Sequence, residues 1–270
     1  MKKIFVVLIV FLLSISLSAC KKNYVIPDDA TTIKVAASPT PHAEILEQCI
    51  PLMAAQGYTL EIKEFSDYIM PNTATEEGSV WANYFQHAPF LEKFNQEKQT
   101  HLVSVGKIHY EPFGIYAGTS SSLSNLPSGS KIIVPNDGTN EARALLLLEQ
   151  VGLITLKNGV DLTATKLDIA DDNGYEIIEA EAAAIANLRK DAALVVLNGN
   201  YALGANLSVN DALAIEDASG VAAQTYANIL VVRKENKEKA IVKALLECLK
   251  SQQIKDFINN KYKGSVVPIH

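Results

Sequence analysis

The chain has 270 residues, a formal net charge of −6 at pH 7 and 48% hydrophobic residues. An acidic chain without a basic cluster argues against nucleic acid as a partner. Its length exceeds the usual size of one domain, so we expect two lobes.

The first twenty residues have the order of an export signal. Lys2 and Lys3 precede an apolar run from Ile4 to about Leu17, and small residues follow up to Cys20. The apolar run is shorter than the roughly 20 residues that a membrane-spanning helix needs. The tetrapeptide LSAC that ends at Cys20 resembles a bacterial lipobox, in which the cysteine receives the lipid and becomes the new N-terminus.

We therefore predict that residues 1–19 are a lipoprotein signal peptide and that residues 20–31 form a polar tether before the first strand. A lipid on Cys20 would anchor the chain to the cell membrane on its extracytoplasmic face, in the periplasm or at the cell surface. The alternative is an ordinary signal peptide, in which the cysteine is incidental.

A β-α-β pattern follows the tether. Residues 32–38 (TIKVAAS) are predicted to form a buried strand, and the alternating run GYTLEIKEF predicts a second one. The helix between them has apolar residues on one face, at Ile45, Leu46, Cys49, Ile50 and Met53. Two strands joined by a helix indicate a parallel sheet.

The same alternation continues to the end of the chain. Further strands are predicted at 79–85, in 101–118, at 131–135, near 167–171, at 193–198 and at 226–236. Helices are predicted at 87–98, 140–153, 179–190, 237–250 and 251–262, and residues 120–130 form a turn-rich loop. Strands that alternate with helices throughout indicate an α/β fold.

No familiar catalytic signature is present in the sequence. It lacks a G-x-S-x-G elbow, a P-loop, an H-E-x-x-H motif and a G-x-G-x-x-G run after a strand. The five histidines, at 42, 87, 101, 109 and 270, include no i, i+4 pair that would chelate a metal on one helix. We therefore predict a protein that is not an enzyme and that has no cofactor or metal.

Two alternatives to a simple binding protein stay open. A metal-capturing lipoprotein would need three or four histidines and carboxylates to converge in space. An exported hydrolase would use His87 or His109 as its base, but no nucleophile stands in a recognisable turn.

Arg143 is the first candidate ligand-binding residue. It lies in the first turn of the helix that begins near Asn140, where the helix dipole disfavours positive charge. The preceding strand places it at the carboxyl edge of the sheet, where open α/β sheets bind ligands. A guanidinium binds a carboxylate through two charge-assisted hydrogen bonds, and helix N–H groups add to such a site. An exposed arginine on the surface is equally consistent with the position.

Two other segments carry polar groups among apolar ones. Asn198 and Asn200 follow the strand at 193–198, where they either present amide groups to a ligand or serve the turn. The run WANYFQHAPF interleaves Gln86 and His87 with aromatic residues, as in the wall of a ligand pocket, although a core cluster explains Phe90 equally well.

These segments together resemble the NlpA family of lipoproteins, the methionine-binding proteins that supply ABC importers. The matching runs are PHAEILE, EFSDYIMPN, ANYFQHAPFL, VPNDGTNEARALLLL, VGLITLKNG, NGNYA, YANILVVRKEN and FINNKYKGSVVP. They span nearly all of the predicted mature chain in order.

The resemblance implies a two-lobed periplasmic-binding-protein fold of the type II-like class, with the ligand in the cleft between the lobes. Lobe 1 would hold residues 32–115 and 228–270, and lobe 2 would hold residues 116–227. A hinge motion would close the cleft. The implied partners are L-methionine or a similar amino acid and the permease and ATPase of an ABC importer.

The resemblance also assigns roles to individual residues. Arg143, helped by Asn140, would bind the α-carboxylate of the amino acid, and Asn198 and Asn228 would complete the grip on carboxylate and ammonium. The side-chain pocket, in which a thioether gains from aromatic contact, would be lined by Tyr68, Phe85 and His87.

Two positions depart from the family pattern. Thr40 stands where glycine is usual, and Trp81 replaces a usual acidic residue. If either side chain reaches the cleft, the ligand could instead be another amino acid or a short peptide. Cys49 and Cys248 are expected as two buried thiols on separate helices; export permits a disulfide between them, but their spacing does not indicate one.

Overall fold

The computed structural model describes residues 24–216 and 221–269. The predicted signal peptide, the lipidation site at Cys20 and the first residues of the tether lie outside the described residues. Within the described part of the chain, no helix combines the length and apolar character needed to cross a membrane.

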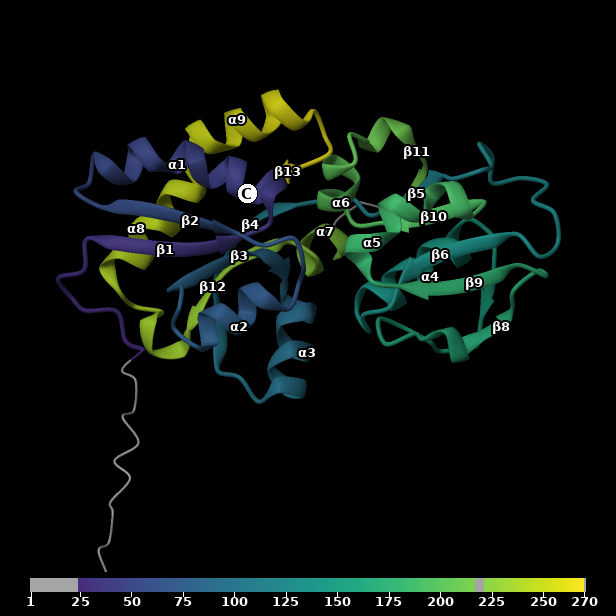
Figure 1. Ribbon diagram of the computed structural model, residues 1–270, viewed down its shortest axis with the longest axis horizontal. Coiled ribbons are helices and arrows are strands. Elements are labelled where there is room, and N and C mark those ends of the chain that lie inside the picture. The colour runs from purple at the N-terminus through teal and green to yellow at the C-terminus, as the bar shows by residue number, and fades with distance from the viewer. Residues whose placement is uncertain (1–23, 217–220, 270) are drawn as a thin grey trace, which may run out of the picture.

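Two β-sheets lie side by side along the long axis of the molecule (Figure 1). In the described residues, the first sheet has six strands in the order β13-β4-β12-β3-β1-β2. These strands are β1 (Thr32–Ala37), β2 (Thr59–Glu64), β3 (Ala82–His87), β4 (Leu102–Tyr110), β12 (Asn228–Arg233) and β13 (Val267–Pro268).

The second sheet has five described strands in the order β11-β5-β10-β6-β9. They are β5 (Gly114–Ala117), β6 (Lys131–Pro135), β9 (Glu176–Ala180), β10 (Leu194–Leu197) and β11 (Ala212–Ile215). A small antiparallel pair, β7 (Thr155–Leu156) and β8 (Ile169–Asp171), stands apart from it.

Helices cover both faces of the first sheet (Figure 1). On one face lie α1 (Glu44–Ala54), α8 (Ala240–Leu249) and α9 (Gln252–Tyr262), and on the other lie α2 (Met70–Glu76) and α3 (Ala88–Lys98). The second sheet is accompanied by α4 (Asn140–Gln150), α5 (Ala182–Ile185), α6 (Gly199–Gly204) and α7 (Val221–Thr225).

Strand pairing confirms the predicted β-α-β opening. β1 pairs in parallel with β2 and with β3, so the early part of the chain builds a parallel sheet. β12 then returns from the second sheet and pairs antiparallel with β3 and β4. The first sheet is therefore mixed, and the chain enters it twice.

The chain crosses between the sheets twice. Residues 111–113 lead from β4 to β5, and residues 216–227 lead from β11 back to β12. Our division into lobes at 115 and 227 stays a proposal; the pairing of β5 with β10 favours a first boundary just before Gly114.

Each sheet has its own apolar core. The first is centred on β-strand residues such as Val35 and on the inner faces of α1 and α8, and the second on residues such as Leu145 of α4 and Val196 of β10. The predicted inner face of α1 is buried except for Ile50, which is 42% exposed. Ile50 lies at the edge of that face, one residue beyond the buried Cys49, and is partly exposed to solvent.

Cys49 and Cys248 meet on facing helices. Both thiols are free and buried, and the Cys248 sulfur lies 3.9 Å from the carbonyl oxygen of Cys49. They pack α1 against α8 inside the first core.

The predicted helix at 179–190 differs from the structure. Its first residues belong to β9, one α-helical turn forms α5, and a 3₁₀ segment (Ala186–Asp191) completes it. β9 pairs in parallel with β6, and Ile177 is buried in the second core, so tertiary pairing overrides the helical propensity of the alanine-rich run.

Asn236 secures the start of the described chain. It is fully buried, its Oδ1 accepts the Ile26 backbone N–H at 2.8 Å, and its Nδ2 donates to the Tyr24 carbonyl at 3.0 Å. We expect Asn236→Ala to lower the free energy of unfolding by about 1–3 kcal/mol because it leaves these buried backbone groups unsatisfied.

Urea denaturation measures this change. Asn260→Ala, at an exposed position of α9, is the matched control and should change stability by less than about 0.5 kcal/mol. Equal effects of the two substitutions would contradict the assigned role of Asn236.

Candidate functional site

A cavity lies between the two sheets, and the space between its lining atoms, including the part open to solvent, is about 360 Å³. All seven predicted ligand residues line the cavity, namely Tyr68, Phe85, His87, Asn140, Arg143, Asn198 and Asn228. Its other lining residues are Gln86, Phe90, Glu111, Gly199 and Asn200.

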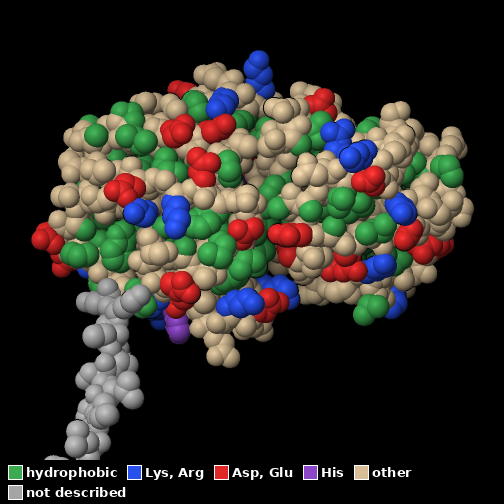
Figure 2. Space-filling model, viewed as in Figure 1, with side chains coloured by type: hydrophobic (Ala, Val, Ile, Leu, Met, Phe, Trp, Pro, Cys, Tyr) green, Lys and Arg blue, Asp and Glu red, His purple; other side chains and the backbone are tan. Residues whose placement is uncertain are grey.

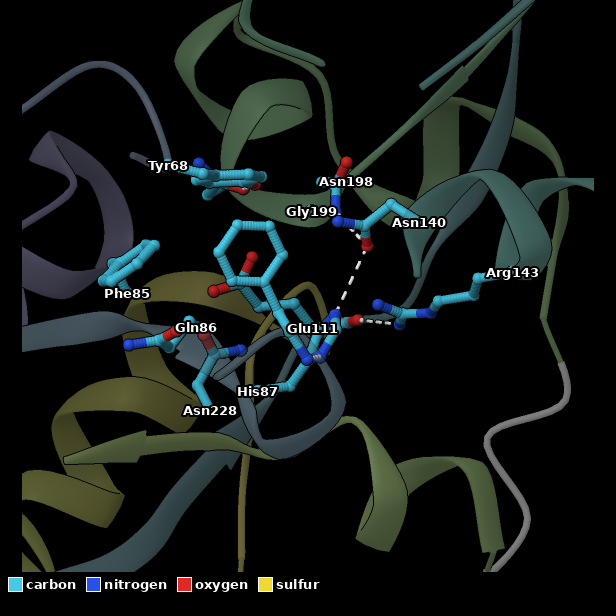
Figure 3. A pocket seen from close by; sticks show the side chains of 12 residues that line it. Tyr68, Phe85, Gln86, His87, Glu111, Asn140, Arg143, Asn198, Gly199 and Asn228 are labelled. Carbon is cyan, nitrogen blue, oxygen red and sulfur yellow. Dashed lines mark hydrogen bonds between the residues drawn. The ribbon is translucent and has the colours of Figure 1, made fainter. Parts of the chain in front are cut away.

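Both sides of the molecule contribute to this cavity (Figure 3). The end of β3, the start of β12 and the loop before α2 supply groups from the first side. The first turn of α4 and the start of α6 supply groups from the second. β3 and β10 end at the cavity, and β6 leads to α4, whose first turn lines it, so the cavity lies at the carboxyl edge expected for an α/β ligand site.

One end of the cavity is aromatic. The ring centroid of Tyr68 lies 5.8 Å from that of Phe85 and 5.7 Å from that of Phe90. The Tyr68 hydroxyl donates to Asn200 Oδ1, so its polar atom is turned toward the second lobe. These rings form an apolar wall with one polar edge.

Arg143 is buried and already paired with a carboxylate of the chain. Its Nε donates to Glu216 Oε2 at 2.8 Å, and its Nη2 donates to Glu216 Oε1 and, at 3.1 Å, to the Glu111 carbonyl oxygen. Burial disfavours the charged guanidinium, but Glu216 outweighs burial and raises the pKa of Arg143. The anion expected near this helix start is therefore present in the protein itself.

The Nη1 edge of Arg143 has no hydrogen-bond partner among the described residues. The guanidinium lies over the Tyr226 ring, 4.3 Å from its centroid, and 4.7 Å from the Phe113 centroid. The side chain extends from α4 toward the cavity (Figure 3). The remaining edge is thus held in place and available to an anionic ligand.

Asn140 uses its side chain within the protein. Its Nδ2 donates to both carboxylate oxygens of Asp137, at 2.9 and 3.0 Å. Its Oδ1 accepts from Asn198 Nδ2 at 2.9 Å and lies 3.3 Å from His87 Nε2. This arrangement favours a positioning role for Asn140, whose side-chain groups are engaged within the protein.

Asn198 keeps one group available. Its Nδ2 donates to Asn140, whereas its Oδ1 is buried and has no hydrogen-bond partner among the described residues. An unpartnered buried carbonyl oxygen is costly, so it favours a ligand that donates a hydrogen bond.

His87 is neutral and structurally engaged. Burial, with the nearby Arg143 charge, lowers its pKa to about 3. Its Nδ1 accepts the Phe90 backbone N–H at 3.2 Å and thereby caps α3, and its Nε2 faces Asn140. Neither ring nitrogen contacts a nucleophile, so the site gives no support to a hydrolase with His87 as base.

Glu111 is a cavity residue that our sequence analysis missed. It lies at the first crossing, is 6% exposed, and approaches Gly199 so closely that a Cβ at residue 199 would lie 2.9 Å from Oε2. Burial raises the pKa of Glu111, while His42 and Arg143 oppose this rise. An acidic residue between a strand and Pro112, in the apolar run YEPFGIY, is the signal that could have indicated it.

Three residues behind the cavity form a buried cluster. The side-chain donor atoms of His42, His109 and Glu111 lie within 4.8 Å of one another, which gives the number of ligands that the metal-capture alternative requires. However, His109 Nε2 lies 2.8 Å and His42 Nε2 lies 3.3 Å from the same oxygen, Glu111 Oε1. The His109 contact is a hydrogen bond to Glu111, whereas the His42 Nε2 hydrogen bond goes to Asn228 Oδ1 at 2.9 Å, so both nitrogens are engaged within the protein.

The two departures from the family pattern lie off the cavity. Thr40 lines a neighbouring cavity of about 820 Å³, and its hydroxyl donates to Glu44 Oε2 at 3.1 Å. Trp81 packs against the core of the first sheet. Neither side chain lines the 360 Å³ cavity.

Comparison with known proteins gives one consistent result. The family profile described as NlpA lipoprotein matches residues 33–270. The methionine-binding lipoprotein MetQ of Bacillus subtilis is 41% identical over 275 residues, covering 100% of this chain and 99% of MetQ.

Solved structures agree with the sequence match. A lipoprotein from Ruminococcus gnavus is 54% identical with a TM-score of 0.88, covering 89% of this chain and 100% of that one. A nutrient-binding protein from Burkholderia cenocepacia, solved bound to methionine, is 37% identical with a TM-score of 0.83, covering 88% of this chain and 100% of that one. The two-lobed periplasmic-binding-protein fold is thus established, and the chain belongs to the NlpA lipoprotein family.

Proposed function

We propose that this protein captures L-methionine, or a closely related amino acid, in the cavity between its lobes and delivers it to the permease of an ABC importer. The proposal is carried by one observation: a cavity between the lobes that is aromatic at one end and has separate acidic and basic groups at the other. Relatives that are named methionine-binding, and one solved with methionine, support this ligand.

The polar groups sort into a donor set and an acceptor set. The free edge of Arg143 and the amide of Asn228 supply donors for an α-carboxylate, and Asn228 Oδ1 is already hydrogen-bonded to His42 at 2.9 Å. Glu111 and the unpartnered Oδ1 of Asn198 supply acceptors for an α-ammonium. The resemblance also assigned Asn140 to the polar end. In this proposal Asn140 acts indirectly, because it holds Asn198 in place through a hydrogen bond.

Magnitudes favour this division. Burying a methionine side chain against Tyr68, Phe85 and Phe90 provides roughly 1.5–3 kcal/mol. A micromolar dissociation constant requires about 8 kcal/mol. The remainder must come from the charged ends, where each charge-assisted hydrogen bond contributes about 1.5–3 kcal/mol.

The proposed setting is the extracytoplasmic face of the membrane. Attachment would come from a lipid on Cys20, with residues 20–31 as the tether. On the face shown in Figure 2, basic and acidic side chains are interspersed, which suits a lipid anchor better than attachment through a cationic surface. The importer's permease and ATPase would be the protein partners.

Mass spectrometry of ligand retained from expression tests the proposal. We expect L-methionine to be released on denaturation, and calorimetry on protein unfolded and refolded without ligand should show a dissociation constant of about 1 μM or tighter. Glutamate and lysine should not bind, because the aromatic end of the cavity offers no partner for their charges. Metal analysis tests the metal-capturing alternative, and titration with methionine-containing dipeptides tests the peptide-binding alternative. Binding of a metal or a dipeptide in preference to methionine would overturn the proposal.

Glu111→Gln should weaken methionine binding by about ten- to hundredfold, since it removes the charge opposite the ammonium. Affinity of the unsubstituted protein should also fall as pH drops through the raised pKa of Glu111, because protonation removes the same charge. The glutamine variant should lack this dependence.

Isothermal titration calorimetry at several pH values measures both effects. Glu149→Gln is the matched control, since Glu149 accepts the Leu156 N–H in the second lobe and lines no part of the cavity. Unchanged affinity in Glu111→Gln would exclude Glu111 as the ammonium partner.

Glu216→Gln should lower the free energy of unfolding by about 3–5 kcal/mol, because it leaves the buried Arg143 without its counter-charge. Glu97→Gln makes the same chemical change in the exposed pair with Lys93 and should cost less than about 1 kcal/mol. Urea denaturation of both variants measures the free energies of unfolding. A decrease for Glu216→Gln as small as that for Glu97→Gln would contradict the importance given to the Arg143–Glu216 pair.

A further inference from the structure

His42 stands behind the cavity and does not line it. It is 1% exposed and lies in the segment Pro39–Ala43 that precedes α1. Its Nε2 lies 2.9 Å from Asn228 Oδ1 and 3.3 Å from Glu111 Oε1. One ring nitrogen of a residue outside the cavity therefore contacts two residues inside it.

The partners of this nitrogen fix where its proton lies. A carboxylate oxygen and an amide oxygen both accept hydrogen bonds, so Nε2 must carry the proton. It donates this proton to Asn228 Oδ1 at 2.9 Å and faces Glu111 Oε1 at 3.3 Å. The other nitrogen, Nδ1, is buried and has no partner among the described residues, which disfavours a second proton there. Burial accordingly lowers the pKa of His42 to about 4, and the ring stays neutral near pH 7.

His109 completes the arrangement around Glu111. Its Nε2 lies 2.8 Å from Oε1, and its Nδ1 is hydrogen-bonded to the Tyr84 hydroxyl. Burial lowers its pKa to about 3, so it also acts as a neutral N–H donor. His109 thus holds Oε1 of Glu111, which the His42 ring also faces, and Oε2 remains beside Gly199 at the cavity.

The contact with His42 also orients Asn228. An amide can present either its oxygen, which accepts hydrogen bonds, or its amine, which donates them, to a ligand. Because Oδ1 is bound to His42, the amine is the group left for the ligand. Asn228 then acts as a donor and Glu111 as an acceptor, as a carboxylate and an ammonium respectively require.

We propose that His42 is a positioning residue for ligand binding: its N–H, bound to Asn228 Oδ1, fixes Asn228 as a donor beside the acceptor Glu111, and so sets which end of the amino acid binds where. This inference rests on the proposed function. Without the N–H, the Asn228 amide is free to reverse, and its oxygen would then oppose the ligand carboxylate.

A matched pair of substitutions tests the role. In His42→Gln, the side-chain amine stands the same number of bonds from Cβ as Nε2 and can reach Asn228. In His42→Asn, the same amide is one methylene shorter and cannot. We expect His42→Asn to weaken L-methionine binding about ten- to hundredfold, as for loss of one to two charge-assisted bonds, and His42→Gln to restore most of it.

A second ligand separates positioning from a general structural effect. L-methioninamide keeps the ammonium and the side chain of methionine but has no carboxylate. The unsubstituted protein should strongly prefer methionine, and His42→Asn should reduce that preference about tenfold, because a reversed Asn228 penalises the carboxylate more than the amide. Calorimetry gives the affinities, and circular dichroism and melting temperature establish that each variant is folded.

The outcomes distinguish the possibilities. Equal losses for both ligands in His42→Asn, or failure of His42→Gln to restore binding, would overturn the positioning role while leaving the proposed function intact. Metal that copurifies with the protein and is lost in both variants would assign the cluster to metal binding instead and overturn the inference. Absence of methionine binding in the unsubstituted protein would refute the proposed function itself.

Discussion

The site depends on the ion pair between Arg143 and Glu216. The same carboxylate also accepts the Phe113 backbone N–H at 3.0 Å and the Tyr110 hydroxyl. Phe113 lies on the first crossing between the lobes and Glu216 begins the second. One carboxylate therefore joins the arginine of α4 to both crossings. A buried arginine without this partner would be an isolated charge in a low-dielectric interior, which is strongly unfavourable.

This pairing defines what is left for a ligand. Glu216 takes the Nε and Nη2 edge of Arg143, so a ligand carboxylate would join an existing ion pair instead of meeting a lone cation. Glu111 is the reverse case: among the described residues its carboxylate is hydrogen-bonded to the neutral ring of His109 and lies 3.3 Å from the neutral ring of His42. Its opposite charge would come from the ligand ammonium. In the proposed binding mode, the charge of Arg143 at the carboxylate end is already neutralised by Glu216. At the other end, the charge of Glu111 is neutralised only by the ligand ammonium.

Local sequence rules predicted much of the fold and part of the site. Strand and helix periods located β1, α4 and α8, and the rule that ligands bind at the carboxyl edge singled out Arg143. The dipole argument predicted an anion at this helix, but Glu216 is 73 residues away in sequence and no local pattern connects the two. His42 and His109 were uninformative for the same reason, since their chemistry depends on Glu111 reaching them across the fold. The sequence analysis did not predict β9 because the alanine-rich run that follows it favours a helix. The strand forms because it pairs with β6, which no local pattern indicates.

The division of the cavity between the lobes suggests an order of events for the proposed ligand. Its aromatic end is built from Tyr68, Phe85 and Phe90, all of the first lobe, so it exists before the cleft closes. The lobes are joined by neutral hydrogen bonds such as that from Tyr68 to Asn200, each contributing about 0.5–1.5 kcal/mol. A ligand shifts the open–closed equilibrium only if it binds the closed state more tightly. A ligand side chain that contacts only the first lobe binds the open and closed states equally well. A ligand carboxylate that also reaches Arg143 in the second lobe binds the closed state more tightly. Selection of the side chain would thus precede closure, and the carboxylate would drive it.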